Sequence, residues 1–257
     1  MAIDHYENFP VASWLCPRAI RPAVLSLYGF ARYADDVADE GTASPEQRLA
    51  DLHSLRHALL EAQRQGVMGA QAHPTLHALW PQVQRHGLPV SCLFDLLDAF
   101  EQDVRMTADQ SGMRSWDEVL DYCQRSANPV GRLMLALLGQ NAPEQLQQSD
   151  AICTALQLIN FWQDLSIDRP RGRHYLPPNV GLAPAMAMTR DLMIQGAPLA
   201  WQLSGRMGLE LRAVIHGGLR VLELMGELDV TQQRPQLSRW DWVVIATRSM
   251  SPLPPKV

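Results

Sequence analysis

The sequence predicts an all-α protein. Helix-forming residues such as Ala, Leu, Gln, Arg, Glu and Met are frequent, whereas alternating runs of Val, Ile and Thr, which are typical of strands, are hard to find. Apolar residues also recur at helical spacing in segments that are bounded by proline or glycine. With 257 residues the chain can bury a large core, and we expect one domain over residues 1–257.

Composition and charge exclude several classes of function. The net charge is -5 and no basic patch is present, so we expect no nucleic acid partner. The chain lacks a run of about 18 apolar residues, and its first residues do not resemble a signal peptide. The four cysteines form no CxxC pair and are expected to be buried free thiols, which suits a reducing compartment. We therefore expect a cytoplasmic protein, and peripheral membrane contact stays open.

Prolines, glycines and capping residues place the predicted helices along the chain. Pro45 after Ser44 marks one helix start, and the Ser115-x-x-Glu118 capping box marks another. Gly41 marks a helix end. The expected helices cover residues 18–40, 45–65, 74–86, 90–105, 115–138, 143–168, 197–226 and 238–250, with short helices over 183–195.

A kink is predicted in the middle of the helix over 115–138. Pro129, preceded by Asn128, removes a backbone donor and clashes with the preceding turn, and Gly131 leaves the next turn bare. A bend at this point would open room beside a cavity, or it would serve packing alone. The residues expected to line that room are Ser126, Val130 and Leu133.

The segment over residues 157–168 organises the rest of the chain. On a helix, Gln157, Asn160, Asp164 and Asp168 fall on one narrow stripe, and nearly all other positions around it are apolar. Two carboxylates cannot lie against hydrocarbon, because an unpaired buried charge costs several kcal/mol. The stripe must therefore face something wet or cationic, and a metal-bearing cavity inside a helical protein satisfies both conditions.

A second acidic pair lies on the helix over 18–40. Asp35 and Asp39 are four residues apart and point the same way, and they border an apolar stripe together with Tyr28 and Arg32. Two Asp-x-x-x-Asp pairs on facing helices would place four carboxylates around one space. Mg²⁺ prefers oxygen ligands and commonly combines one or two carboxylates with substrate phosphate oxygens.

Basic residues that could bind a diphosphate lie next to both pairs in the sequence. Arg32 precedes the first pair, and the loop after the second pair carries Arg171, Arg173 and Tyr175. Gln157 and Asn160 would extend the set with neutral polar groups. Metal and arginine together make diphosphate a good leaving group, because they neutralise the charge that develops on its oxygens.

Each of these patterns has a plainer explanation. Acidic residues after an arginine on a helix are often a solvated face with local ion pairs, and Arg171-x-Arg173 is most often an exposed basic loop. No GxGxxG motif follows a strand, so we expect no built-in nicotinamide site. Four aromatic residues fit a core better than a cation-stabilising role: Phe9, Phe94, Phe161 and Trp162. Three histidines match no metal-binding spacing: His5, His174 and His216.

The motifs taken together resemble the squalene/phytoene synthase family. Four segments carry the resemblance, namely residues 28–39 (YGFARYADDVAD), 122–131 (YCQRSANPVG), 157–168 (QLINFWQDLSID) and 171–177 (RGRHYLP). Two further segments, residues 5–13 (HYENFPVAS) and 128–132 (NPVGR), are most similar to one branch of that family, the hydroxysqualene synthases of bacterial hopanoid pathways.

The resemblance implies an isoprenoid-synthase-type helical bundle with a central active-site cavity. It implies Mg²⁺ as the cofactor, without NADPH, bound through Asp35, Asp39, Asp164, Asp168 and Asn160. The four aspartates would be catalytic together with Arg32 and Tyr28. The substrate-binding residues that it implies are His5, Asn8, Phe9, Tyr122, Ser126, Gln157, Asn160, Arg171, Arg173 and Tyr175.

Two departures from the family pattern bear on the expected reaction. Gln163 stands where many members carry arginine, and Asn8 stands where many carry serine; both changes remove features associated with the two-step synthases. The branch implies conversion of presqualene diphosphate and water to hydroxysqualene and diphosphate. The alternatives are a head-to-head synthase acting on two prenyl diphosphates and a non-catalytic helical scaffold. Besides a prenyl diphosphate, a membrane surface and neighbouring hopanoid-pathway enzymes are the partners that the resemblance suggests.

Overall fold

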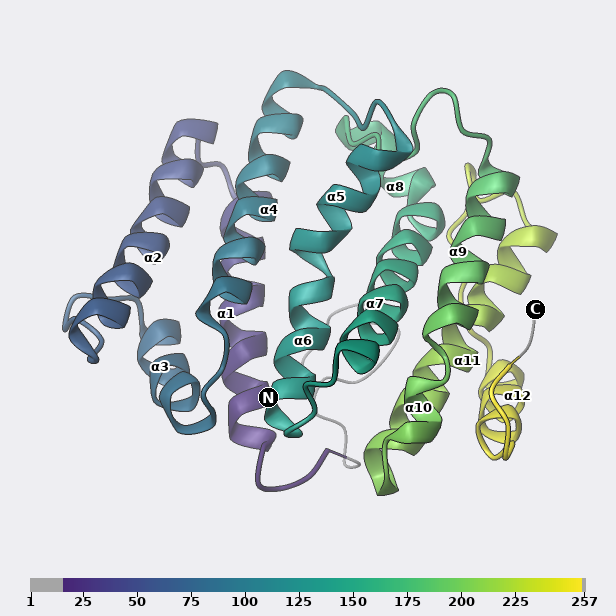
Figure 1. Ribbon diagram of the computed structural model, residues 1–257. Helices are drawn as coiled ribbons and strands as arrows, with labels where there is room; N and C mark the ends of the chain where they lie inside the picture. The colour runs from purple at the N-terminus through teal and green to yellow at the C-terminus, as the bar shows by residue number, and fades with distance from the viewer. Residues whose placement is uncertain (1–15, 256–257) are drawn as a thin grey trace.

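The computed structural model describes residues 16–255, apart from the side chain of Arg171, and shows helices joined by short loops (Figure 1). In the first half the helices are α1 (Arg21–Asp39), α2 (Pro45–Gln65), α3 (Pro74–His86), α4 (Val90–Asp109), α5 (Trp116–Ser126) and α6 (Asn128–Leu137). In the second half they are α7 (Pro143–Gln163), α8 (Leu165–Asp168), the 3-10 turn η1 (Arg169–Arg171), α9 (Leu182–Gly196), α10 (Leu199–Gln202), α11 (Gly205–Glu227) and α12 (Arg239–Ser249). Residues 16–255 contain no strand, so the all-α prediction is confirmed.

Helix starts follow the capping residues that the sequence indicates. The Ser44 side chain accepts a hydrogen bond from the backbone N–H of Gln47, and Ser115 caps α5 in the same way. Ser238 and Asp241 form a complete capping box at the start of α12. Helix α2 ends at Gly66, whose φ of 73° is a conformation that glycine adopts without strain.

Several predicted bounds in the first half of the chain are wrong. Helix α1 begins at Arg21 instead of residue 18, because the preceding residues form a turn in which the Pro17 carbonyl accepts from the N–H of Ile20 and of Arg21. Helix α4 extends past Arg105 to Asp109. The predicted kink is a full interruption between α5 and α6, centred on Ala127, whose φ is -117°.

The second half departs from prediction at two further places. The expected helix over 143–168 ends at Gln163, because Asp164 leaves the helical conformation before the short helix α8 begins. The expected helix over 197–226 is divided into α10 and α11, since Leu203 and Ser204 are extended and Gly205 has a φ of 65°. Conversely, residues 182–196 form one helix instead of several short ones.

After the interruption at Ala127, α6 crosses α7 closely. A Cβ atom on Gly131 would lie 2.3 Å from the Ser149 Oγ and 2.6 Å from the Cys153 Sγ, so only glycine fits this crossing without a shift. The Thr154 hydroxyl of α7 donates to the side chain of buried Asn128 at 2.9 Å. The break is therefore held by packing and by a buried hydrogen bond.

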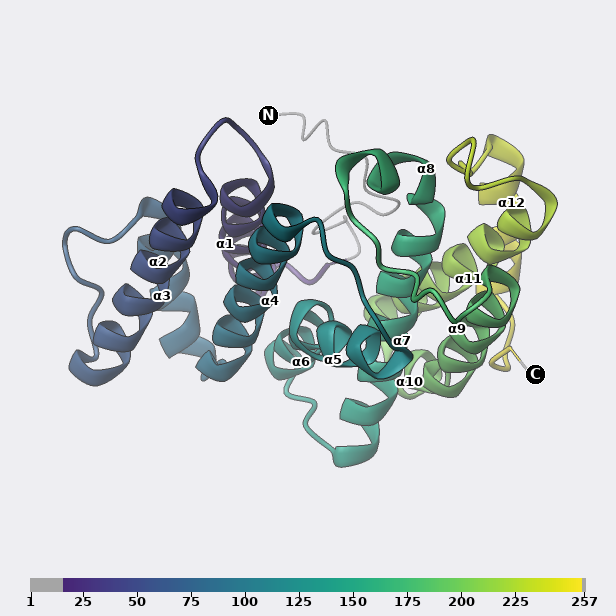
Figure 2. The same ribbon diagram turned by 90° about the horizontal axis from the view of Figure 1, so that it is seen from above.

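Two groups of helices enclose a cavity of about 460 Å³ with apolar walls. Seen from above, α1 to α4 lie on one side, α7 and α9 to α12 on the other, and α5 and α6 stand between them (Figure 2). Val24 and Leu27 of α1 face Ile152 of α7 and Leu211 of α11 across the cavity. Of the residues predicted to line it, Val130 and Leu133 do so, whereas Ser126 does not.

Cysteines and membrane spans also bear on the predictions from composition. Cys16, Cys92 and Cys123 are buried free thiols, as expected, and Cys153 is free but partly exposed. Within residues 16–255, no helix combines the length and the apolar character that a bilayer span requires.

Candidate functional site

The first acidic pair lies on the last two turns of α1. Arg32 contacts three acids of the same helix end, Asp35 at 3.1 Å, Asp36 at 2.6 Å and Glu40 at 2.8 Å. The side chains of Asp35 and Asp36 are 39% and 40% exposed. Around Arg32, the arrangement is therefore the solvated face with local ion pairs that the plainer explanation expects.

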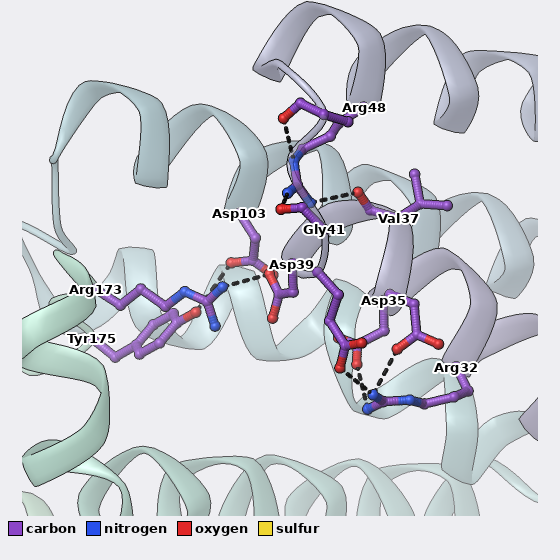
Figure 3. A network of polar contacts seen from close by, with 12 residues as sticks. Arg32, Asp35, Val37, Asp39, Gly41, Arg48, Asp103, Arg173 and Tyr175 are labelled. Carbon is purple, nitrogen blue, oxygen red and sulfur yellow. Dashed lines mark hydrogen bonds and ion pairs between the residues drawn. The ribbon is translucent and has the colours of Figure 1, made fainter.

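Asp39 differs from its neighbours because its partner comes from far along the chain. The Arg173 guanidinium, which is only 14% exposed, contacts the Asp39 carboxylate at 2.6 Å (Figure 3). Arg48 of α2 fixes the chain on both sides of Asp39 by donating to the carbonyls of Val37, Gly41 and Ala43. The C-terminal end of α1 is thus tied to two other segments.

The loop that carries Arg173 is docked through its backbone. The N–H of Met113 donates to the His174 carbonyl at 2.8 Å, and a Cβ atom on Gly112 would lie 2.5 Å from the His174 Cβ. Only glycine permits so close an approach between these two loops. This contact aims Arg173 and Tyr175, on either side of His174, at the space between α1 and α4.

A buried carboxylate that the sequence analysis did not single out lies at the centre of this space. The Tyr122 hydroxyl donates to Asp103 of α4 at 2.6 Å, and the Tyr175 hydroxyl donates to it at 3.3 Å. Burial raises the pKa of Asp103 to about 7, although the two tyrosine hydrogen bonds oppose that shift. Burial also raises the pKa of both tyrosines well above its ordinary value.

Aromatic packing fixes the position of the two tyrosines. The Phe161 ring stacks on Tyr175 with 3.8 Å between the ring centroids, and it meets Tyr122 at 5.8 Å. Phe161 is 5% exposed, and Trp162, which is fully buried, donates to the Thr189 hydroxyl. Phe161 and Trp162 are therefore core residues, as the sequence indicates, and Phe161 also supports the site.

The second acidic pair surrounds the break between α7 and α8. Asp164 accepts a hydrogen bond from the Arg234 guanidinium, which comes from the loop between α11 and α12. One helical turn is completed across the break, because the Asp168 N–H donates to the Asp164 carbonyl at 2.8 Å. On the same stripe Gln157 is half-buried and Asn160 is exposed, so the stripe faces solvent-accessible space as predicted.

Electrostatic effects connect each acidic pair to its surroundings, and one carboxylate from each pair acts on Tyr175. Partial burial and the nearby Asp39 charge raise the pKa of Asp35 to about 6. The charges of Asp39 and Asp168 both raise the pKa of Tyr175, so one carboxylate from each pair lies near that hydroxyl. Carboxylates that repel one another in this way favour the binding of a cation.

The carboxylates and the amide of this site suit Mg²⁺, which can take part of its ligands from a substrate. They suit less well an ion that must take all of its ligands from protein side chains. Within residues 16–255 no three or more His, Cys, Asp or Glu side chains converge closely enough to hold one ion. Mg²⁺ needs only one or two carboxylates when a diphosphate supplies further oxygens. Asp35, Asp39, Asp164 and Asp168, with the amide oxygen of Asn160, provide that kind of donor set.

The remaining predicted site residues lie in separate segments of the chain. Tyr28 lines the apolar cavity, one turn below Arg32 on α1. The Ser126 Oγ is buried at the end of α5. Arg171 lies in η1, and its side chain is outside the described part of the chain. His5, Asn8 and Phe9 lie outside the described residues, so their predicted roles stay untested.

Known proteins match this chain in sequence and in structure. Residues 3–183 match the family model described as squalene/phytoene synthase. Hydroxysqualene synthase from Rhodopseudomonas palustris is 33% identical over 95% of this chain and 88% of its own length. Hydroxysqualene synthase from Zymomonas mobilis is 39% identical over 68% of this chain, but the match spans only 56% of that relative. The crystal structure of squalene synthase HpnC from Alicyclobacillus acidocaldarius gives a TM-score of 0.75 at 30% identity, over 87% of this chain and 89% of that chain.

Proposed function

Because the chain belongs to the squalene/phytoene synthase family of head-to-head prenyl synthases, we propose that it converts presqualene diphosphate and water into hydroxysqualene and diphosphate. Membership of this family and the isoprenoid-synthase fold, both implied by the motifs, are confirmed. The choice of substrate rests on the named relatives and on the residues that resemble the hopanoid branch.

One observation carries the proposal: on α1 and on α7, the polar side chains of the site begin one helical turn beyond the wall of an apolar cavity. Asp35 is one turn after Ala31 on α1, and Asn160 is one turn after Leu156 on α7; both Ala31 and Leu156 line the cavity. A prenyl diphosphate has the same division into a charged head and hydrocarbon chains. The polarity of the site therefore suits a substrate of this class.

The charged end of the site suits the loss of diphosphate. Bound Mg²⁺ would supply Lewis-acid neutralisation of the leaving group. Asp35 and Asp39 of α1 would hold it from one side, and Asp164, Asp168 and Asn160 from the other. Arg173, at the rim between them, has the planar guanidinium that recognises phosphate oxygens in a bidentate manner. The carbon–oxygen bond would break with its electron pair leaving on the diphosphate.

The apolar walls would control the cation that remains. Leu27, Leu133 and Leu156 offer no nucleophile, so a cyclopropylcarbinyl cation held against these side chains can rearrange before water adds. Water then forms the new carbon–oxygen bond and releases a proton to solvent. The balance requires no reductant, in agreement with the expectation that NADPH is not used.

The alternative of a head-to-head synthase acting on two prenyl diphosphates depends in part on Gln163. This residue stands where many family members carry arginine, and here it is fully buried and donates to the Pro235 carbonyl at 2.6 Å. A side chain engaged in this way is not available to a second diphosphate, which favours the single conversion. A non-catalytic scaffold is disfavoured, since it gives no reason to keep like charges close together.

The test is incubation of the full-length protein with presqualene diphosphate and Mg²⁺, without any reductant. We expect a C30 alcohol and free diphosphate, and no product when Mg²⁺ is chelated. Turnover of farnesyl diphosphate alone to presqualene diphosphate, squalene or a phytoene-like product would favour the head-to-head alternative. If neither substrate is bound or consumed, the scaffold explanation is left.

A further inference from the structure

The last helix, α12, presents large apolar side chains to solvent. Trp240 is 79% exposed and Met250, at the C-terminal end of the helix, is 74% exposed; Trp242 and Val243 are exposed as well. The helix lies at the outer edge of the molecule in both views (Figure 1 and Figure 2). Single exposed apolar residues are ordinary on a protein surface, but a group of them on one helix marks an interaction site.

The opposite side of α12 packs against α11 and fixes the direction in which these side chains point. Ile245 is buried, and Arg220 of α11 contacts Asp241 at 2.6 Å. One turn from the end of α12, Arg248 contacts Glu223 of α11 at 2.7 Å. Asp241 also closes the capping box at the start of the helix. The outward face therefore belongs to a helix that is held at both ends.

The charged residues of α12 are divided between its two sides. Asp241 and Arg248 are the ones that form ion pairs with α11. Arg239 is exposed and, at 100° per residue, lies within about 40° of Val243 and Met250 around the helix. The outward face of α12 thus combines apolar side chains with one positive charge and no carboxylate. Such a face complements an anionic surface.

The hydroxyl on the outward face is satisfied within the helix. Thr247 donates to the carbonyls of Val243 and Val244, at 3.0 Å and 2.8 Å. Just after the helix, the Ser251 carbonyl accepts a hydrogen bond from the Trp201 indole at 3.1 Å, which ties the end of α12 to α10. Groups that are already paired lose little when water is removed from the surface around them.

The size of the outward face decides between a protein partner and a lipid surface. A helix of 11 residues that is packed on one side offers far fewer contacts than the roughly 20–30 residues that each partner gives to a stable protein interface. A lipid surface has no such requirement, because each apolar side chain that enters it adds its own transfer free energy. Tryptophan also prefers the boundary between headgroups and acyl chains, where its ring is buried and its N–H stays wet.

We propose that the outward face of α12 docks this protein on the surface of a bilayer that contains anionic lipid. Trp240, Val243 and Met250 enter the boundary between headgroups and acyl chains, and Arg239 contacts lipid phosphate. The helix then lies along the surface of the bilayer. The proposal goes beyond the proposed function and does not depend on it, although a prenyl diphosphate and a C30 alcohol both partition into bilayers.

The test is flotation of the full-length protein with vesicles, without substrate or metal. Vesicles of phosphatidylcholine alone are compared with vesicles that also contain about one-third phosphatidylglycerol, and the wild-type protein should bind the anionic vesicles several-fold more tightly. Trp240→Gln should bind both kinds about 10-fold more weakly or worse, because a large side chain no longer enters the lipid. Arg239→Gln should lose the preference for anionic vesicles and keep its binding to phosphatidylcholine.

Matched control variants lie at the opposite edge of the molecule, near the end of α2 (Figure 1). Val67 and Arg64 are both exposed there. Val67→Gln and Arg64→Gln remove an apolar and a cationic side chain from a face that does not dock, so their vesicle binding should equal that of the wild type. All four variants change exposed side chains and should keep the wild-type melting temperature, which separates loss of docking from unfolding.

Each outcome decides the matter. Weaker binding in Trp240→Gln, together with loss of the anionic preference in Arg239→Gln, supports the proposal. A wild-type protein that floats with neither kind of vesicle overturns it, as does equal flotation of wild type and Trp240→Gln, or an anionic preference that persists in Arg239→Gln. Self-association that Trp240→Gln abolishes, measured by sedimentation without vesicles, would assign the face to a second copy instead.

The vesicle test is independent of the proposed reaction, since no substrate enters it. A protein that binds vesicles through α12 but does not consume presqualene diphosphate would contradict the proposed function alone. A protein that converts the substrate but does not bind vesicles would contradict the docking surface alone.

Discussion

The two acidic pairs have the same spacing in the sequence but different local structures. Asp35 and Asp39 lie on one uninterrupted helix, whereas Asp164 and Asp168 lie on either side of the junction between α7 and α8. The first pair also has a nearby arginine on its own helix, Arg32. The second pair receives its arginine from a loop 70 residues away along the chain.

Two motifs with the same spacing can therefore be held in place by different structural elements. The first pair shares one face of a continuous helix, since residues four apart point the same way, and Arg173 then contacts Asp39. The second depends on the loop between α11 and α12, which contacts both Gln163 and Asp164. Changes in that loop should therefore affect the second pair and spare the first.

The largest effect that we expect is a loss of turnover when one aspartate of either pair is replaced, and it shows whether the two pairs contribute equally to catalysis. Asp39→Asn and Asp164→Asn should each lower turnover by ~10²-fold or more, the scale seen when one charge-stabilising group is removed. Folding should survive, because the amide has the same shape and relieves repulsion between carboxylates. Steady-state kinetics with circular dichroism of both variants checks this. A large loss in one variant only would show that a single pair carries the reaction.

The next effect concerns Asp103, which supports the side of the site near Asp39. Its folded-state pKa is raised from 3.8 to about 7, so its protonated form is favoured in the fold. The stability that it contributes is complete below its unfolded pKa and is lost as the pH rises toward and through about 7. An amide at this position does not titrate, so Asp103→Asn should gain melting temperature relative to wild type between pH 4 and pH 8. Parallel curves of melting temperature against pH for the two proteins would contradict the assignment.

A smaller effect tests the anchor of the second pair. Gln163→Leu leaves the Pro235 carbonyl without its buried donor, which should cost about 1–3 kcal/mol. A chain of this size should then melt roughly 2–10 °C lower. The affinity for pyrophosphate in the presence of Mn²⁺ should also fall, because the same loop contacts Asp164 of the second pair. Thermal unfolding and calorimetry measure the two effects, and unchanged values for both would show that the loop is held elsewhere.

The smallest effect concerns the break between α5 and α6. Pro129→Ala removes the proline that favours the break, but Asn128 still bonds Thr154, so stability should change by no more than about 1 kcal/mol. Turnover or product distribution should change if the break shapes the cavity that Val130 and Leu133 line. Unaltered kinetics and products would mean that the break serves packing alone.

The sequence predicts this fold well because its helix signals are local. Ser44, Ser115 and Ser238 cap the helices that they were expected to start, and the acidic stripe faces accessible space. The interruption at Asp164 has no such signal, since neither proline nor glycine is present. Tertiary contacts with a later loop hold the chain at Asp164, and such contacts do not show in the periodic pattern of apolar residues.

The candidate site is only partly predictable for the same reason. Asp103 shares a face of α4 with buried Leu96 and Ala99, and a carboxylate on an apolar face is a signal that the sequence does offer. Arg234 offers none, because one arginine in a polar loop looks like any other. Its contact with Asp164 joins positions 70 residues apart, which only the folded structure reveals.

The most direct test of the central claim is the position of metal and diphosphate in a crystal grown with Mn²⁺ and pyrophosphate. Anomalous scattering identifies the metal without reference to any assumed ligand. The two acidic pairs are expected to share one metal–diphosphate cluster, with Mn²⁺ coordinated by aspartates from both α1 and the α7–α8 junction. Metal bound to only one pair, or bound elsewhere on the protein, would contradict the claim that these carboxylates form a single site.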